Sequence, residues 1–156
     1  MNRIQIELPD VFDFRTLMDV RITDINYGGH LGNDSVLSLI HEARVRFFLS
    51  LGVSESDIGG TGIIMSDASI VFKSESFYGD CLAVSVAVGG ISTSSFDLFY
   101  LIEQDEARRE VARAKTGIVC FDYSARRIRP IPASFLAVIH ADGSFAGIPD
   151  GRGKSG

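Results

Sequence analysis

A single long amphipathic segment, from Asn33 to Leu51, most constrains what this chain can fold into. Apolar side chains recur along it at spacings of three and four residues, which predicts a helix with one broad apolar stripe. Asn33 or Asp34 is the expected N-cap of this helix, and Gly52 is the residue expected to end it. Because the stripe must be buried, other elements of the chain have to pack against it.

Most of the remaining chain carries the patterns of strands that could cover this helix. Alternation of apolar and polar residues predicts a strand over residues 17–23 and a short edge strand over 4–8. After the helix, the sequence predicts strands over 63–72, 82–88, 96–103 and 111–123, and a short closing helix over 132–139. The predicted fold class is therefore α+β, with an antiparallel sheet of five or six strands wrapped around one long central helix. Phe99 and Leu101 interrupt the alternation of their strand, so we expect the helix to cover one of its faces and a partner subunit the other.

Size and composition are those of one small globular domain. The chain has 156 residues, of which 46% are hydrophobic and 22% charged. We expect residues 1–140 to form a single domain and the Gly-rich residues 141–156 a loosely ordered tail. The net charge of −5 argues against a nucleic-acid partner. No segment reads as a membrane span or a signal peptide, and two cysteines make no disulfide framework, which predicts a cytoplasmic protein without a membrane partner.

Polar and titratable side chains gather on the Gly-rich loop that precedes the helix. Asp24, Asn26, His30 and Asn33 lie on or next to this loop, and Glu42 follows two turns into the helix. Unpaired N–H groups at a helix start can hold an anion or an oxyanion, so the loop could form part of a catalytic site. The same residue types are also ordinary turn formers and caps, which is the alternative interpretation. No spacing of His, Cys and acidic residues predicts a metal site.

Two stretches of the sequence resemble a known family. The stretch from Val20 to Asn33, VRITDINYGGHLGN, and the later Glu42-Ala43-Arg44 are similar to the hotdog-fold acyl-CoA thioesterases of the 4-hydroxybenzoyl-CoA thioesterase-like superfamily. In that family a D-x-D-x-x-G-H-V-N-N loop is followed by a helix ending in E-x-A-R. The turn Phe77-Tyr78-Gly79-Asp80 resembles the turn before the family's third strand. The resemblance extends from about Thr16 to Tyr123 and implies a hotdog fold and thioester hydrolysis.

The chain departs from the family pattern at the position that matters most for catalysis. The second acidic residue of the family loop, which acts as base or nucleophile, is Asn26 here. An amide cannot take a proton from water at neutral pH. The resemblance therefore leaves Glu42 as the first candidate for the base, Asp24 as the second and His30 as a third, while Asn26 could orient water or the thioester carbonyl.

The resemblance also implies where an acyl-CoA would lie. Backbone N–H groups around Gly29, Gly32 and Asn33 would hold the carbonyl oxygen. Phe47, beside Phe48, would line a tunnel for the acyl chain, although burial in a core is the commoner role of such residues. The basic residues that could meet the CoA phosphates, unless they are simply solvated, are Arg126 and Arg127, with Lys73, Lys115 and Arg129 as further candidates.

Together these features predict an acyl-CoA thioesterase that hydrolyses the thioester of a fatty or aromatic acyl-CoA. It would need no cofactor other than the coenzyme A of its substrate, and the resemblance implies a homodimer or homotetramer. Two alternatives stay open. One is a non-catalytic hotdog protein that binds acyl-CoA or an acyl carrier, which Asn26 motivates. The other is a hotdog enoyl-CoA hydratase in which His30 works with Glu42 or Asp24.

Overall fold

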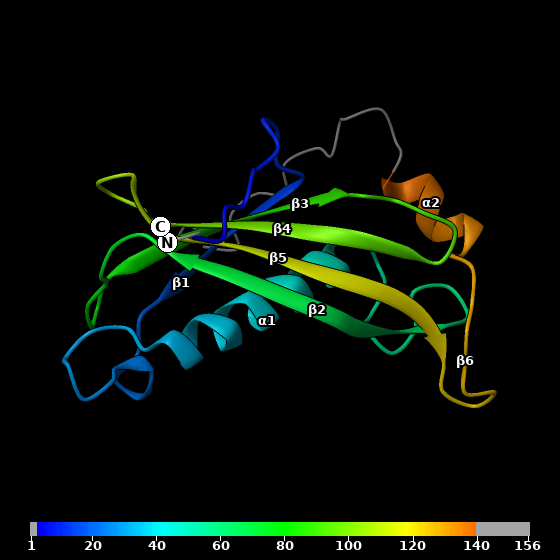
Figure 1. Ribbon diagram of the computed structural model, residues 1–156, viewed down its shortest axis with the longest axis horizontal. Coiled ribbons are helices and arrows are strands. Elements are labelled where there is room, and N and C mark those ends of the chain that lie inside the picture. Colours follow the sequence, from blue (N-terminus) through cyan, green and yellow to red (C-terminus); the bar gives the residue numbers. More distant parts are fainter. Residues whose placement is uncertain (1–2, 140–156) are drawn as a thin grey trace, which may run out of the picture.

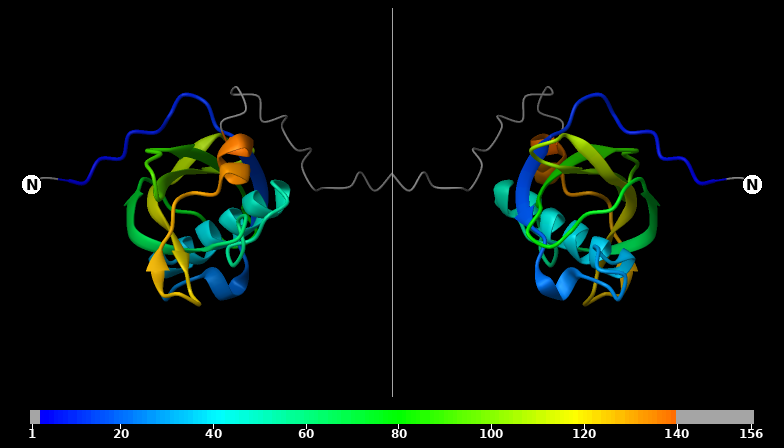
Figure 2. Two further views of the ribbon diagram at one scale, coloured as in Figure 1. Left: turned by 90° about the vertical axis from the view of Figure 1, so that its right-hand side faces the viewer. Right: turned by 90° about the vertical axis from the view of Figure 1, so that its left-hand side faces the viewer.

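An antiparallel sheet curves around one long helix in the computed structural model, which describes residues 3–139 (Figure 1). The helix, α1 (Asn33–Ser50), follows β1 (Phe14–Asp19) and a short 3-10 turn, η1 (Ile22–Asp24). The elements after α1 are β2 (Gly62–Phe72), β3 (Cys81–Gly89), β4 (Ser95–Gln104), β5 (Arg109–Asp122), β6 (Arg127–Ile128) and α2 (Ala133–Ile139). The two end views show how the sheet bends around α1 (Figure 2).

The strand order brings the two segments that flank α1 to the two edges of the sheet. Neighbouring strands follow the order β1–β3–β4–β5–β2, β6 pairs with β5, and every pair is antiparallel. The first strand after α1, β2, therefore pairs with β5, from Gly62 opposite Phe121 to Phe72 opposite Ala112. This arrangement confirms the predicted sheet of five or six strands wrapped around a central helix.

Aromatic side chains fill the space between α1 and the sheet. Phe47 and Phe48 of α1 are fully buried, with ring centroids 5.8 Å apart. Phe135 of α2 extends this core, because its ring centroid lies 6.0 Å from that of Phe48 and 5.4 Å from that of Phe96. The predicted closing helix over 132–139 is thus confirmed, and its role is to complete the aromatic core.

The first strand differs from the sequence prediction because a side chain turns the backbone there. β1 ends at Asp19, and residues 22–24 form η1 instead of continuing the strand predicted over 17–23. The Asp24 carboxylate accepts a hydrogen bond from the backbone N–H of Arg21 at 2.8 Å, which closes the turn. Ile22, which strand alternation would place on the buried face, is 68% exposed as a result.

The predicted edge strand over 4–8 was also wrong, since the structure assigns no strand between residues 3 and 13. Ile6 is buried, but its carbonyl accepts a hydrogen bond from Arg113 Nη1 at 3.2 Å in place of a strand partner. Residues 4–7 lie beside Phe99 on the sheet face away from α1. Phe99 and Leu101 are half-buried there, so the chain's own N-terminal segment covers part of the face for which a partner subunit is expected.

The sequence predicted the C-terminal end of α1 correctly but not its N-cap. Gly52 follows the helix with a φ of +76° and donates its N–H to the Leu49 carbonyl at 3.0 Å, as predicted. At the other end the N-cap position belongs to Gly32, not to Asn33 or Asp34, and no side chain caps the helix. The start of α1 therefore keeps unpaired N–H groups.

Burial of Phe47 predicts a large loss of stability on truncation. Phe47→Ala should lower the free energy of unfolding by about 3–5 kcal/mol, because it leaves a cavity in the aromatic core. The matched control is Leu49→Ala on the same helix, which is 63% exposed and should change the value by no more than about 0.5 kcal/mol. Urea unfolding followed by circular dichroism measures both, and similar losses in the two variants would contradict this core.

Candidate active site

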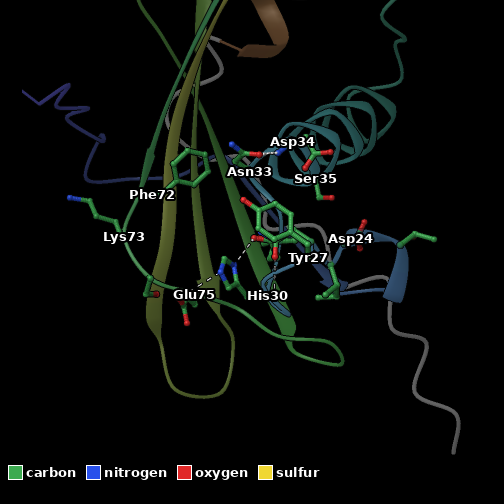
Figure 3. A pocket seen from close by; sticks show the side chains of 14 residues that line it. Asp24, Tyr27, His30, Asn33, Asp34, Ser35, Phe72, Lys73 and Glu75 are labelled. Carbon is green, nitrogen blue, oxygen red and sulfur yellow. Dashed lines mark hydrogen bonds and ion pairs between the residues drawn. The ribbon is translucent and has the colours of Figure 1, made fainter.

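An open pocket of about 730 Å³ lies at the N-terminal end of α1 (Figure 3). Residues of the loop before α1, the first turn of α1 and the end of β2 line it together. We call it the loop pocket, and its lining residues are Thr23, Asp24, Ile25, Asn26, Tyr27, His30, Leu31, Asn33, Asp34, Ser35, Phe72, Lys73, Ser74 and Glu75. Of the predicted site residues, Asp24, Asn26, His30 and Asn33 meet here.

The loop from residue 24 to residue 32 is closed by its own hydrogen bonds. The backbone N–H of Asn26 donates to the His30 carbonyl at 2.9 Å, and that of Gly32 donates to the Asp24 carbonyl at 2.9 Å. The side-chain oxygen of Asn26 accepts the N–H of Gly28 at 2.8 Å and that of His30 at 3.4 Å. Gly29 has a φ of +81°, which favours glycine at this position. Asn26 therefore shapes the loop with its oxygen.

Asp24 lies in the wall of the pocket but is occupied by Arg21. Its side chain is only 4% exposed. One carboxylate oxygen accepts the backbone N–H and the Nε–H of Arg21, at 2.8 and 3.3 Å, and the other lies 3.2 Å from Arg21 Nη2. The carboxylate also raises the pKa of the Arg21 guanidinium through these hydrogen bonds and its charge. Asp24 thus stabilises the η1 turn.

The start of α1 offers backbone donors to the pocket. Asp34 donates its N–H to the Asn33 side-chain oxygen at 2.8 Å, and Val36 donates to the Gly32 carbonyl at 3.2 Å. Among the described residues, the N–H groups of Asn33 and Ser35 find no acceptor. Unpaired amides at a helix start carry partial positive charge, so they can hold a carbonyl or oxyanion oxygen.

A histidine and a glutamate face each other across the loop pocket (Figure 3). His30 Nε2 lies 3.7 Å from Glu75 Oε1, and His30 Nδ1 lies 3.4 Å from the Leu31 carbonyl oxygen. The segment that carries Glu75 is tied to the loop, because Leu31 donates its N–H to the Ser76 carbonyl at 2.8 Å. Sequence reasoning missed Glu75, which is remote from His30 along the chain and has no motif of its own.

Arg109, at the start of β5, fixes the backbone beneath Glu75. Its Nη1 donates to Ser74 Oγ at 2.6 Å and to the Glu75 carbonyl oxygen at 2.5 Å. Ser74 Oγ in turn donates to the Glu110 carbonyl at 2.6 Å. Lys73, one of the cations considered for the CoA phosphates, lies on the same segment, and its ammonium has no ion-pair partner among the described residues.

Glu42 lies apart from these residues. It lines a second pocket of about 400 Å³ with Asp19, Arg21, Ser38 and Arg46, among others. Its carboxylate accepts a hydrogen bond from Arg46 Nε at 3.0 Å. Within one chain, the structure therefore does not bring Glu42 to the loop pocket.

The remaining predicted binding residues also lie elsewhere. Phe47 is fully buried in the core and lines no described pocket. Arg126 and Arg127 are exposed in the hairpin between β5 and β6, at the opposite end of the longest axis from the start of α1 (Figure 1). Lys115 forms ion pairs with Asp67 and Asp97 at 2.9 and 3.3 Å. One chain thus brings neither arginine to the loop pocket.

Other reactive groups fall outside this pocket. Burial raises the pKa of the Cys120 thiol to about 11, so it is not a thiolate at neutral pH. The described residues contain no cluster of three or more His, Cys, Asp or Glu that could hold a metal ion. No helix among residues 3–139 is long and apolar enough to cross a membrane. His140 and the predicted tail over 141–156 lie outside the described residues.

Comparison with known sequences identifies relatives. Residues 20–139 match the model of the thioesterase-like superfamily. A curated relative, the 1,4-dihydroxy-2-naphthoyl-CoA hydrolase of Microcystis aeruginosa, is 31% identical over 121 residues. That match covers 76% of this chain and 83% of the relative.

Solved structures share the architecture. A 1,4-dihydroxy-2-naphthoyl-CoA thioesterase from Synechocystis superposes with a TM-score of 0.75 at 28% identity, covering 81% of this chain and 94% of its own. A Staphylococcus aureus protein, solved in complex with CoA, superposes with a TM-score of 0.75 at 18% identity and covers 85% of both chains. The second likeness shows the fold alone. The predicted hotdog fold is confirmed.

Replacing Asn26 tests whether its side-chain oxygen holds the loop together. Asn26→Ala should lower the free energy of unfolding by about 0.5–1.5 kcal/mol, because the Gly28 N–H loses its acceptor. The control, Asn26→Asp, keeps an oxygen acceptor in the same place and should lose less. Chemical denaturation at pH 7 measures both values. Equal losses would show that the oxygen does not stabilise the loop.

Proposed function

We propose, from the premise that this chain belongs to the thioesterase-like superfamily and hydrolyses acyl-CoA thioesters, that hydrolysis takes place in the loop pocket with His30 as the general base. One observation carries this assignment: His30 faces Glu75 in the same pocket as the unpaired amides of the α1 start. Asp24 is occupied by Arg21, and Glu42 faces a different pocket. Neither is placed to activate water there.

The amides of α1 would bind the thioester carbonyl oxygen. As water attacks the carbonyl carbon, negative charge develops on this oxygen, and the N–H groups of Asn33 and Ser35 are available to donate to it. The positive end of the helix dipole stabilises the same charge. Because no side chain among the described residues accepts from these two N–H groups, nothing has to be displaced from them.

His30 would move the protons. When Nδ1–H donates to the Leu31 carbonyl, Nε2 presents its lone pair and can take a proton from the attacking water. The Glu75 carboxylate, 3.7 Å from Nε2, stabilises the imidazolium that forms. The imidazolium then returns the proton to the sulfur of CoA as the carbon–sulfur bond breaks. Asn26 acts through the loop, because its oxygen accepts the N–H of His30.

The proposed substrate is an aromatic acyl-CoA. The 31% identical relative is named for a naphthoyl-CoA substrate, and this chain exposes two aromatic side chains at the rim of the loop pocket, Tyr27 and Phe72. Coenzyme A would enter only as part of the substrate, so no further cofactor is proposed. Cytoplasmic action fits this substrate class and the two-cysteine composition.

A second copy of the chain would complete the site. Arg126 and Arg127 lie at the far end of their own chain from the loop pocket, so only those of another copy could meet a CoA bound there. β2 is an edge strand of the sheet, and it carries the exposed apolar residues Met65 and Phe72. An unprotected edge of this kind invites pairing with another strand.

Substitutions in the pocket test the roles of His30 and Glu75. His30→Gln should lower kcat by at least about 100-fold, because the general base is lost. Glu75→Gln should lower it by about tenfold, since one charge that favours the imidazolium is removed. Glu42→Gln makes the same chemical change outside the loop pocket and should leave kcat unchanged. A thiol-reactive dye measures the CoA released from benzoyl-CoA.

Four outcomes would contradict the proposal. An unchanged rate in His30→Gln would place the base elsewhere, and a large loss in Glu42→Gln would return it to the helix. Binding of acyl-CoA by calorimetry without release of thiol would favour the non-catalytic alternative. Loss of enoyl-CoA absorbance without release of thiol would favour a hydratase.

Sedimentation equilibrium tests the second copy. The measured mass should be at least twice the 16.9 kDa of one chain, independent of substrate. A monomer that turns over acyl-CoA at full rate would show that one chain holds a complete site.

A further inference from the structure

The N-terminal segment, residues 3–13, crosses the outer face of the sheet, which is the face away from α1. We call this segment the N-terminal arm. At β3, Asp13 donates its N–H to the Val86 carbonyl at 2.9 Å, and its carboxylate accepts the N–H of Val88 at 2.8 Å. Nearer the N-terminus, residues 4–7 share a small cavity with one residue from each of β4, β5 and β2, which are Phe99, Lys115 and Ser69. The arm therefore runs across the sheet from β3 to β2.

The arm is anchored on its own chain as far as Ile6. Ile6 is only 9% exposed, and its carbonyl oxygen accepts a hydrogen bond from Arg113 Nη1 at 3.2 Å. Arg113 of β5 is itself held by Glu110, whose carboxylate accepts hydrogen bonds from its Nε and its Nη2. Because the guanidinium is planar and rigid, these two hydrogen bonds also fix the donor that Ile6 meets. This anchor sets the direction in which the residues before Ile6 leave the sheet.

One side of the arm is apolar, and the chain's own sheet covers only part of it. Ile6 is buried and Leu8 half-buried, whereas their neighbours Gln5 and Glu7 are exposed. This alternation is typical of an extended segment with one side on a surface. It places Ile4 on the same side of the arm as Ile6, yet Ile4 is 64% exposed. The arm thus carries an apolar side chain on its sheet side that its own sheet leaves uncovered.

The arm continues past the edge of the sheet. β2 is the edge strand on this side, and the dark blue arm passes the green β2 and runs on away from the rest of the chain (Figure 2). The same edge is the one through which the proposed function pairs a second copy. Two copies joined there are related by a two-fold axis, and their outer faces form one continuous surface. An arm that passes β2 of one copy therefore enters the outer face of the other.

We propose that the N-terminal arm of each chain binds a second copy of the chain across their paired β2 edges, with Ile4 packed on the outer face of that copy. The inference rests on the second copy in the proposed function. The two arms cross the paired edges in opposite directions, as the two-fold axis requires, so each pair buries two Ile4 side chains. Ile4 is not among the residues that line the loop pocket, so the arm contributes to association and not to the chemistry.

A matched pair of charge substitutions in the arm tests this inference. Ile4→Asp should raise the dissociation constant of the pair by about tenfold or more, because apolar burial is lost and a carboxylate would have to leave water. The control is Val11→Asp, since Val11 is equally exposed, at 67%, but lies two residues from the Asp13 anchor over its own sheet. It should change the constant by no more than about twofold. Fluorescence-detected sedimentation of the full chain measures both, and equal effects of the two variants overturn the inference.

Photo-crosslinking locates the end of the arm directly. With p-benzoylphenylalanine in place of Ile4, irradiation should give a covalent dimer whose crosslinked peptide contains β2 or β5. Mixing isotopically labelled with unlabelled chains shows whether the crosslink joins two copies. The same amino acid in place of Val11 should give little covalent dimer. Crosslinks from position 4 that stay within one chain, or covalent dimers formed equally from both positions, overturn the inference.

Association and turnover are measured separately, so failure of this inference differs from failure of the proposed function. If no acyl-CoA is hydrolysed but Ile4→Asp still weakens the pair, the proposed function fails and the role of the arm is supported. If acyl-CoA is hydrolysed and the dissociation constant is the same in Ile4→Asp as in the unmodified protein, the role of the arm alone is overturned. A protein that is monomeric at every concentration overturns both this role and the second copy.

Discussion

Burial of the apolar face of α1 is the constraint on which the rest of the structure depends. Phe47 and Phe48 are fully buried against the sheet, and Phe135 of α2 extends the same core. This packing fixes the axis and rotation of α1, and so decides where its uncapped start points. The loop pocket lies at the end of α1, on a side that burial leaves open. The position of the loop pocket therefore depends on core residues that do not themselves line the pocket.

Features that depend on local periodicity were predicted correctly from the sequence. The helix from Asn33, the later strands and the loop pocket's own residues follow from spacing and composition, because neighbours along the chain decide them. Prediction failed where a side chain overrode the pattern. Alternation continues through Ile22, but the hydrogen bonds between Asp24 and Arg21 turn the backbone first.

Contacts between distant segments were beyond reach of the sequence. Glu75 meets His30 only because β2 pairs with β5 and Arg109 then holds the segment that follows β2. Glu42 and His41 are neighbours on α1, yet they face different cavities, because a helix turns by about 100° per residue. Periodicity shows that both are outside the core. Periodicity cannot show which strand lies beside Glu42 and which beside His41. The neighbouring strand decides which of the two side chains can contact a ligand.

Asn26 stands where the family loop has a carboxylate, so the loop of this chain lacks one negative charge beside His30. A carboxylate at this position would accept the same N–H groups of Gly28 and His30, and it would place a negative charge beside His30 inside the loop. With a neutral amide, the carboxylate that faces His30 is that of Glu75, on the segment that follows β2. The charge that favours an imidazolium is then supplied from outside the loop, by a segment whose backbone Arg109 holds. On this account, the proposed pair of His30 and Glu75 depends on the sheet register as much as on the loop motif.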